Sequence, residues 1–321
     1  MKKLFLLLTA VIAYSLGAMA QDSRVATLQH GTHFRTYYGT DAFISAHNDA
    51  SDGDVITLTA GVFNLCDVTK ALTIRGEGMQ KTVLQKSTPL FKIPKDNLYS
   101  LSLEGLTVSN TNSNGTIAIE STGGFATITI SKCVLTGGSY YVRFTNCNAV
   151  VMNSEIKIRT IGYGNSSITC INSKMTTLEG GTFDVQNCVI TGTANVSNSI
   201  IKNSIVYGVT TLNDTNESSH CLVKEGSSGF DNSWYVKTVA PEPDPWDETP
   251  STSILWDELF TGNYHLTAEA SQNYKGTDGT EVGIYGGAYP YDITPDYPLV
   301  KNIEVKGIHE NGKLSVKINV E

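Results

Sequence analysis

The stretch that decides the fold lies in the middle of the chain, where residues 128–135 read ITISKCVL, residues 149–156 AVVMNSEI, residues 168–175 ITCINSKM and residues 183–190 FDVQNCVI. Further copies lie at 101–108 and 199–206. The copies recur about every 15 to 27 residues, a spacing near that of stacked repeats. Apolar and polar residues alternate within each copy, which predicts short strands with one buried face. The repeats therefore predict an all-β solenoid of stacked parallel strands.

Two columns of the aligned copies test the register of that solenoid. Glu155 and Lys174 occupy one of them and should face each other across adjacent coils as an exposed pair. The other column would bring its side chains about 4.8 Å apart, which favours a ladder of hydrogen bonds that stabilises a turn. Alternatively, the asparagine side chains of this column could bind the hydroxyl groups of a sugar. The members of this second column are Lys132, Asn153, Asn172, Asn187 and Asn203.

A helix is expected before the repeats. Residues 40–50 read TDAFISAHNDA and predict a capped amphipathic helix, with Thr40 or Asp41 as its N-cap. Its expected apolar face carries Phe43, Ile44 and His47. Such a helix would plug the end of a solenoid, which otherwise exposes apolar core and unpaired strand edges.

Segments on both sides of the repeats carry a resemblance to a known class. They are DGDVITL at 52–58, AGVF at 60–63, ALTIRGEG at 71–78, NYHLT at 263–267 and TDGTEVGIYGG at 277–287. Together they resemble secreted bacterial right-handed parallel β-helix proteins of the pectin-lyase-like class. The resemblance implies a solenoid with a short N-terminal capping helix. It implies no particular activity, because a fold does not by itself define a function.

The remaining segments suggest how the chain is organised. Residues 1–20 have two lysines, an apolar run and the small-residue site Ala18-Met19-Ala20, which predict a cleavable signal peptide. Residues 21–288 are assigned to the β-helix, with a Pro- and acid-rich loop at 240–253. Residues 289–321 form a C-terminal β tail, in which alternating runs at 300–308 and 314–320 flank Asn311-Gly312 and predict a hairpin.

Charge and hydropathy indicate where the protein acts. The formal charge of −8 becomes −10 once Lys2 and Lys3 leave with the signal peptide, which argues against nucleic acid as a partner. After residue 20 no apolar run is long enough to span a bilayer. The expected location is therefore the periplasm, the cell surface or the extracellular space. The oligomeric state is left open.

Cysteine and histidine positions give little support for cofactor chemistry. Cys133, Cys170 and Cys188 fall in repeat columns where Ser or apolar residues replace them, so they are expected to be buried and free. A disulfide among the other three, Cys66, Cys147 and Cys221, remains open. No zinc-type cysteine spacing occurs, and the His30-x-x-His33 pair has no third ligand nearby. Neither a cofactor nor a metal site is predicted.

Three functional hypotheses follow from this pattern. The favoured one is a non-catalytic protein that binds glycan or another cell-surface component along a solenoid face rich in Thr, Ser, Asn and Tyr. The alternative is a polysaccharide lyase or glycoside hydrolase, for which the weak catalytic candidates are Arg143, Lys157 and Arg159, the last two alternating on one expected strand. No carboxylate pair or calcium-type acidic cluster accompanies them. A spacer role within a larger assembly is a third possibility.

Overall fold

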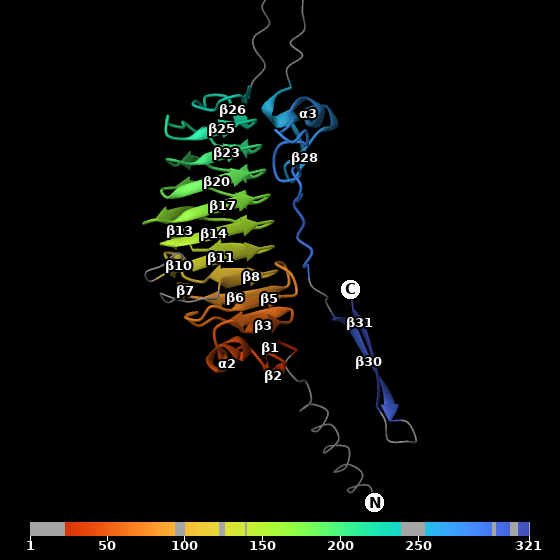
Figure 1. Cartoon of the computed structure of the whole chain (residues 1–321). Helices are drawn as coiled ribbons and strands as arrows, with labels where there is room; N and C mark the ends of the chain where they lie inside the picture. Colours follow the sequence, from red (N-terminus) through yellow and green to blue (C-terminus); the bar gives the residue numbers. More distant parts are fainter. Residues whose placement is uncertain are drawn as a thin grey trace, which may run out of the picture.

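The computed structural model shows a parallel β-helix, a stack of coils whose strands form three long sheets (Figure 1). It describes residues 23–93, 100–121, 126–138, 140–238 and 254–296, together with the backbone of 300–308 and 314–320. The predicted signal peptide and the predicted loop at 240–253 lie outside these residues. The expected fold class is thus confirmed for the part of the chain that is described.

Sheet A contains eleven strands, and all of its pairs from β3 onward are parallel. It begins with an antiparallel hairpin of β1 and β2, and β1 pairs antiparallel with β3. In spatial order the strands are β2 (His33–Tyr38), β1 (Val25–His30), β3 (Val55–Leu58), β5 (Thr73–Gly76), β8 (Leu101–Glu104), β11 (Ala126–Ser131), β14 (Cys147–Met152), β17 (Ser167–Ile171), β20 (Thr182–Gln186), β23 (Ile200–Lys202) and β25 (Glu217–Ser219).

Sheets B and C complete each coil. Sheet B consists of β4 (Gly61–Asn64), β6 (Thr82–Lys86), β9 (Thr107–Asn110), β12 (Val134–Gly137), β15 (Glu155–Ile156), β18 (Lys174–Met175), β21 (Val189–Ile190), β24 (Ile205–Val206), β26 (Leu222–Lys224) and β27 (Trp234–Val236). Sheet C consists of β7 (Leu90–Ile93), β10 (Ile117–Ser121), β13 (Tyr141–Thr145), β16 (Arg159–Tyr163), β19 (Leu178–Glu179) and β22 (Ala194–Asn195).

The repeated apolar residues form continuous files through the core. Ile130 lies beside Val151, Val151 beside Cys170, and Cys170 beside Val185, each pair on adjacent parallel strands. All four side chains are fully buried. Every second residue of these strands therefore faces the core, as the alternation of apolar and polar residues predicts.

The aligned Ser and Cys column is a second buried file. The Ser154 hydroxyl accepts a hydrogen bond from the Cys133 amide at 3.0 Å, and the Ser204 hydroxyl accepts one from the Cys188 amide at 3.1 Å. Small polar side chains thus satisfy backbone donors of the neighbouring coil inside the core. All six cysteines are free, and five are buried. Burial raises the pKa of the Cys133 and Cys188 thiols to about 12.

The expected helix is α2 (Ala42–Asp49), which covers the N-terminal end of the stack (Figure 1). Its buried side chains are Ala42, Phe43, Ala46 and His47, whereas Ile44 is only half-buried. Asp41 occupies the N-cap position, but its side chain makes no cap bond. Its carboxylate instead accepts a hydrogen bond from Asn64 at 2.7 Å, so the helix is confirmed and the side-chain cap is not.

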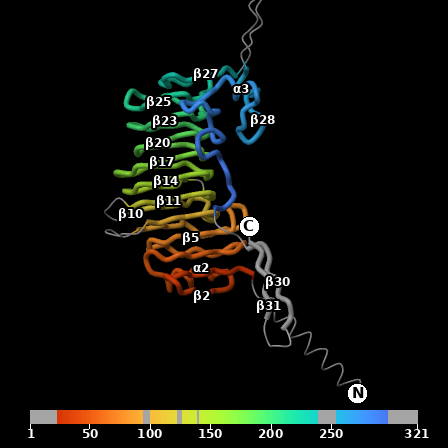
Figure 2. Tube along the Cα trace, turned by 45° about the vertical axis from the view of Figure 1, so that its right-hand side comes forward, coloured from red at the N-terminus to blue at the C-terminus, as the bar shows by residue number. Residues whose placement is uncertain are grey.

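Residues 254–296 form a strap that runs back along the stack (Figure 2). The strap contains a 3-10 helix (Trp256–Glu258), the hairpin of β28 (Phe260–Gly262) and β29 (His265–Leu266), and α3 (Ala268–Asn273). Beyond it, β30 (Val300–Ile308) pairs antiparallel with β31 (Leu314–Val320), which confirms the C-terminal hairpin; its turn lies outside the described residues. No helix in the described part of the chain is long and apolar enough to cross a bilayer.

Candidate functional site

The strap is held by the column of side chains at the turn between sheets A and B. Lys132 and the asparagines of this column all adopt positive φ, between 44° and 54°. Asn172 Nδ2 donates hydrogen bonds to the carbonyl oxygens of Ile284 and Gly286, at 2.8 and 2.7 Å. Asn203 Nδ2 donates to the Thr277 hydroxyl at 3.0 Å, and Asn203 Oδ1 accepts from the Thr277 backbone amide at 2.9 Å. Asparagine suits this turn because it tolerates the left-handed conformation.

The prediction that the side chains of this column bond to one another, from coil to coil, is therefore wrong. Among the described residues no hydrogen bond joins the side chain of one column member to that of the next, and the rung-to-rung bonds are made by the backbone instead. For example, the amide of Asn153 donates to the carbonyl of Ile171 at 3.2 Å. The side chains of Lys132, Asn153, Asn172 and Asn203 bind the strap instead, which the repeat pattern alone does not reveal.

The predicted Glu155 and Lys174 pair has the expected register but not the expected exposure. The two residues lie opposite each other on β15 and β18. Both are half-buried, because the strap covers them. Tyr291 donates its hydroxyl to Glu155 at 3.1 Å, and Glu155 forms its ion pair with Lys157, at 3.3 Å between Nζ and Oε2.

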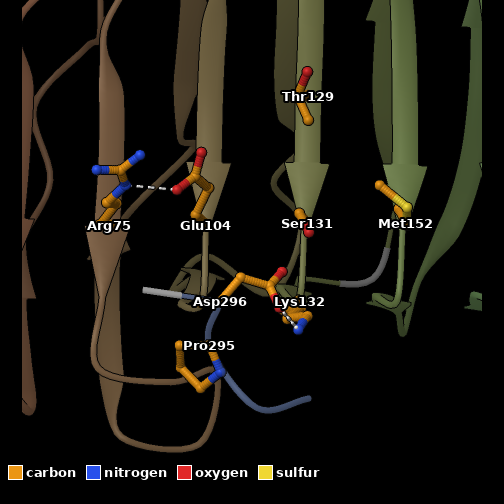
Figure 3. Close-up of a pocket in the computed structure, with 9 residues that line it drawn as sticks. Arg75, Glu104, Thr129, Ser131, Lys132, Met152, Pro295 and Asp296 are labelled. Atoms are coloured by element: carbon orange, nitrogen blue, oxygen red, sulfur yellow. Dashed lines mark hydrogen bonds and ion pairs between the residues drawn. The ribbon is translucent and has the colours of Figure 1, made fainter. Parts of the chain in front are cut away.

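A groove lies where the end of the strap meets the outer face of sheet A (Figure 3). Its first part is a cavity of about 350 Å³. Arg75 and Glu104 form an ion pair on one side, at 2.6 Å between Nε and Oε2. Thr129, Ser131 and Met152 lie on β11 and β14, and Pro295 and Asp296 of the strap lie beyond the ends of these strands, beside Lys132.

The groove continues along the strap into a second cavity of about 760 Å³. The two cavities share Ser131, Lys132, Met152 and Asp296. Apolar surface in the second part comes from Met152, Ile171, Ala288, Tyr289 and Pro290. Tyr289 is 66% exposed, so its ring is accessible to a ligand.

Lys132 fixes the strap at the junction of the two cavities. Its side chain is only 6% exposed, and its ammonium donates to the Thr294 carbonyl and the Asp296 carboxylate. Asp292 lies 3.8 Å away. A hydrogen bond from the Thr294 amide is the main cause that lowers the pKa of Asp292, and Lys132 adds to it. The cation is thus used within the protein and is not available to an acidic ligand.

The three cations predicted for a lyase do not form one cluster. Lys157 follows β15 of sheet B, whereas Arg159 begins β16 of sheet C, so the expectation that they share one strand is wrong. A corner of the coil separates them. Arg143 lies on β13 beside β16, but it faces Ile161 rather than Arg159. Each cation is paired with a carboxylate, Arg143 with Glu120, Lys157 with Glu155, and Arg159 with Glu179 at 3.1 Å.

Other candidate chemistry is equally accounted for by structural contacts. His30 Nδ1 lies 2.7 Å from Asp54 Oδ1, so this histidine is engaged by a carboxylate. Within the ranges that the structure describes, His, Cys, Asp and Glu side chains nowhere gather in threes suited to a metal ion. Trp256 belongs to the strap itself, and its fully buried side chain anchors the strap against the solenoid.

No family model, curated protein or solved structure matches this chain. The groove on sheet A is therefore assessed on its own residues. Sequence reasoning missed it because part of its wall belongs to the strap. The one available signal was the Pro290 and Pro295 segment, which follows the last coil and cannot continue a central strand.

Proposed function

We propose that this protein is a secreted, non-catalytic β-helix protein of the pectin-lyase-like class that binds a polysaccharide in the groove on sheet A. The observation that supports the proposal is the composition of the groove, which combines accessible hydroxyls with flat apolar surface. A sugar ring has the same two parts, hydroxyls at its rim and apolar C–H faces, so this lining is complementary to it.

The hydroxyls of Thr129 and Ser131 are suited to sugar recognition. Both side chains are half-buried and project into the groove (Figure 3). Within the described part of the chain neither hydroxyl has a hydrogen-bond partner. A ligand hydroxyl can therefore bond them without displacing a protein contact.

The charges of the groove favour a neutral polysaccharide. Arg75 is paired with Glu104 and Lys132 with Asp296, so the two cations of the lining are compensated. Asp292 adds a further negative charge. An acidic sugar would have to break an ion pair or approach a carboxylate, and either costs free energy.

Aromatic residues extend the same face beyond the groove. β2 pairs Phe34 with Gln29 and Tyr38 with Val25, two residues of β1 that face away from the core. Phe34 is 67% and Tyr38 is 55% exposed. Exposed rings at the start of the sheet and Tyr289 in the groove provide separate stacking surfaces for an extended chain.

The proposal is tested by retention of the purified mature protein on insoluble neutral and acidic polysaccharides. We expect binding to a neutral polymer, and we expect Tyr289→Ala and Met152→Asp to reduce it. Tyr163→Ala is the matched control, because Tyr163 is equally exposed but lies on β16 of sheet C. Binding that survives both groove substitutions, or retention on no polymer, would overturn the proposal.

The lyase or hydrolase alternative is an outcome of the same experiment. A lyase must neutralise a sugar carboxylate and remove the adjacent proton. Release of unsaturated products or of new reducing ends would show catalysis and contradict the non-catalytic proposal. Loss of that release in the double variant Lys157→Ala with Arg159→Ala would then assign it to those residues.

A further inference from the structure

A second cleft lies on sheet B, on a different face from the groove. It opens where the β28–β29 hairpin lies over β15 and β18, and its volume is about 240 Å³. The hairpin turn consists of Asn263 and Tyr264, with φ of 46° and 66°. Two positive φ values define a type I′ turn, whose second position favours glycine.

Tyr264 is an unusual residue at that position. A bulky side chain with positive φ strains the backbone, and such strain often marks a functional position. The strained turn places the Tyr264 ring at the wall of the cleft, 4.8 Å from Nζ of Lys174. Edge-on contacts with Tyr207 and Phe260 hold the ring in place.

The cleft has an excess of positive charge. Lys157 and Lys174 both line it, and Glu155 is its one carboxylate. Glu155 is already paired with Lys157 and bonded by Tyr291. Among the described residues no carboxylate lies within 4.0 Å of the Lys174 ammonium, although this side chain is half-buried. A half-buried ammonium that contacts only a ring is a favourable partner for an anion.

Two threonines from adjacent coils complete the lining. Thr176 donates its hydroxyl hydrogen to the Ile156 carbonyl at 3.0 Å, and Thr191 donates its own to the Met175 carbonyl at 3.2 Å. Their hydroxyl oxygens therefore remain as acceptors, with fixed orientation. The cleft thus offers an ammonium, an aromatic ring and two acceptors within one small volume.

We propose that this cleft binds a small cyclic carboxylate, with its carboxylate on Lys174 and its ring beside Tyr264. Lys157 also lines the cleft, but its charge is compensated by Glu155, so Lys174 is the cation that receives the ligand. Hydroxyl groups on the ligand, where present, donate to Thr176 and Thr191. This site is separate from the polysaccharide groove, because it uses sheet B and the hairpin rather than sheet A and the end of the strap.

Benzoate is the probe, and benzamide is its neutral isostere. Binding is followed by ligand-observed NMR on the full mature chain, with acetate as a carboxylate that lacks a ring. We expect benzoate to bind more tightly than either benzamide or acetate. Lys174→Met should weaken benzoate about tenfold, because it removes the charge-assisted hydrogen bond and keeps the aliphatic stem. Lys202→Met, on sheet A, is the matched control and should leave benzoate binding unchanged.

The role of Tyr264 needs two variants. Tyr264→Phe keeps the ring and should retain benzoate binding. Tyr264→Gly relieves the backbone strain but removes the ring, so binding should be lost while circular dichroism still reports a folded solenoid. Equal binding of benzoate and benzamide, or benzoate binding unaffected by Lys174→Met, would overturn this proposal. Neither result bears on polysaccharide retention, which depends on Tyr289 and Met152.

Discussion

Sheets A and B present opposite kinds of outer face on the same coils. Ile200 on β23 and Ile205 on β24 belong to one coil and both point away from the core. Ile200 is half-buried on the open face of sheet A, whereas Ile205 is fully buried beneath the strap. The coil itself is the same, so the strap decides which face is available to ligands.

The sequence of the strands in sheet B also shows that their outer face is covered. Three successive strands carry two adjacent apolar residues, Val189-Ile190, Ile205-Val206 and Leu222-Val223. A strand with one open face alternates, whereas a strand buried on both faces does not. The second residue of each pair belongs to the solenoid core, and the first belongs to the cluster formed with Trp256, Leu259 and other strap residues. Paired apolar residues thus predict a covering segment.

Loss of the main anchor should have the largest effect on the covered face. Trp256 is fully buried and packs edge-on against Tyr207 and Phe260, at 5.1 and 5.7 Å between ring centroids. We expect Trp256→Ala to destabilise the strap by about 3–5 kcal/mol. Hydrogen exchange should show the strap opening while the coils stay protected.

Tyr163→Ala is the control for the anchor, because it removes an exposed ring from sheet C. Its effect should remain within about 0.5 kcal/mol. A strap that stays fully protected in Trp256→Ala would mean that the asparagine column alone holds it.

The matched isoleucines test the comparison directly. Ile205→Ala should reduce the free energy of unfolding by about 3 kcal/mol, because it leaves a cavity under the strap. Ile200→Ala should reduce it by about 1 kcal/mol, since its side chain is already partly in water. Equilibrium denaturation of both variants measures the difference. Equal losses would show that the strap contributes no burial at this coil.

The coils were predictable from sequence because their contacts repeat. The files of Ile130, Val151 and Val185, and the facing of Glu155 and Lys174, follow from alternation and from one aligned column. The pairing of β30 with β31 was predictable from the two alternating runs that flank Asn311-Gly312 in the sequence.

The strap contacts were not predictable, because they occur once and join distant parts of the chain. Asn172 bonds Ile284, 112 residues away, and no periodic pattern links the two. The corner between Lys157 and Arg159 was missed for a related reason. Alternation looks the same whether a strand continues or the chain turns into the next sheet, and here it turns after only two residues of β15.

The asparagine side chains that bind the strap should contribute less to the free energy of unfolding than the apolar residues buried beneath the strap. Asn172→Gly keeps the positive φ without strain but removes both hydrogen bonds to the strap, so two carbonyls lose their donor. We expect a loss of about 2 kcal/mol in thermal or chemical unfolding. Asn198→Gly is the control, because Asn198 also has positive φ, at 51°, but is exposed. Equal effects of the two substitutions would mean that Asn172 acts through backbone conformation alone.

The smallest effect concerns two tyrosines on either side of Pro290, and it appears only at high pH. Burial, and then the neighbouring Glu155 carboxylate, raise the pKa of Tyr291 well above 10.0. The unfolded chain then releases this proton more readily than the folded one, so the stability it contributes is present below about pH 10 and is lost as the pH rises further. The loss is at most about 1.4 kcal/mol per pH unit.

Tyr291→Phe should therefore unfold with a weaker pH dependence between about pH 10 and 11 than Tyr289→Phe, which alters an exposed ring of the strap. Identical pH profiles for the two variants would show that packing of the strap on the solenoid does not bury the Tyr291 hydroxyl.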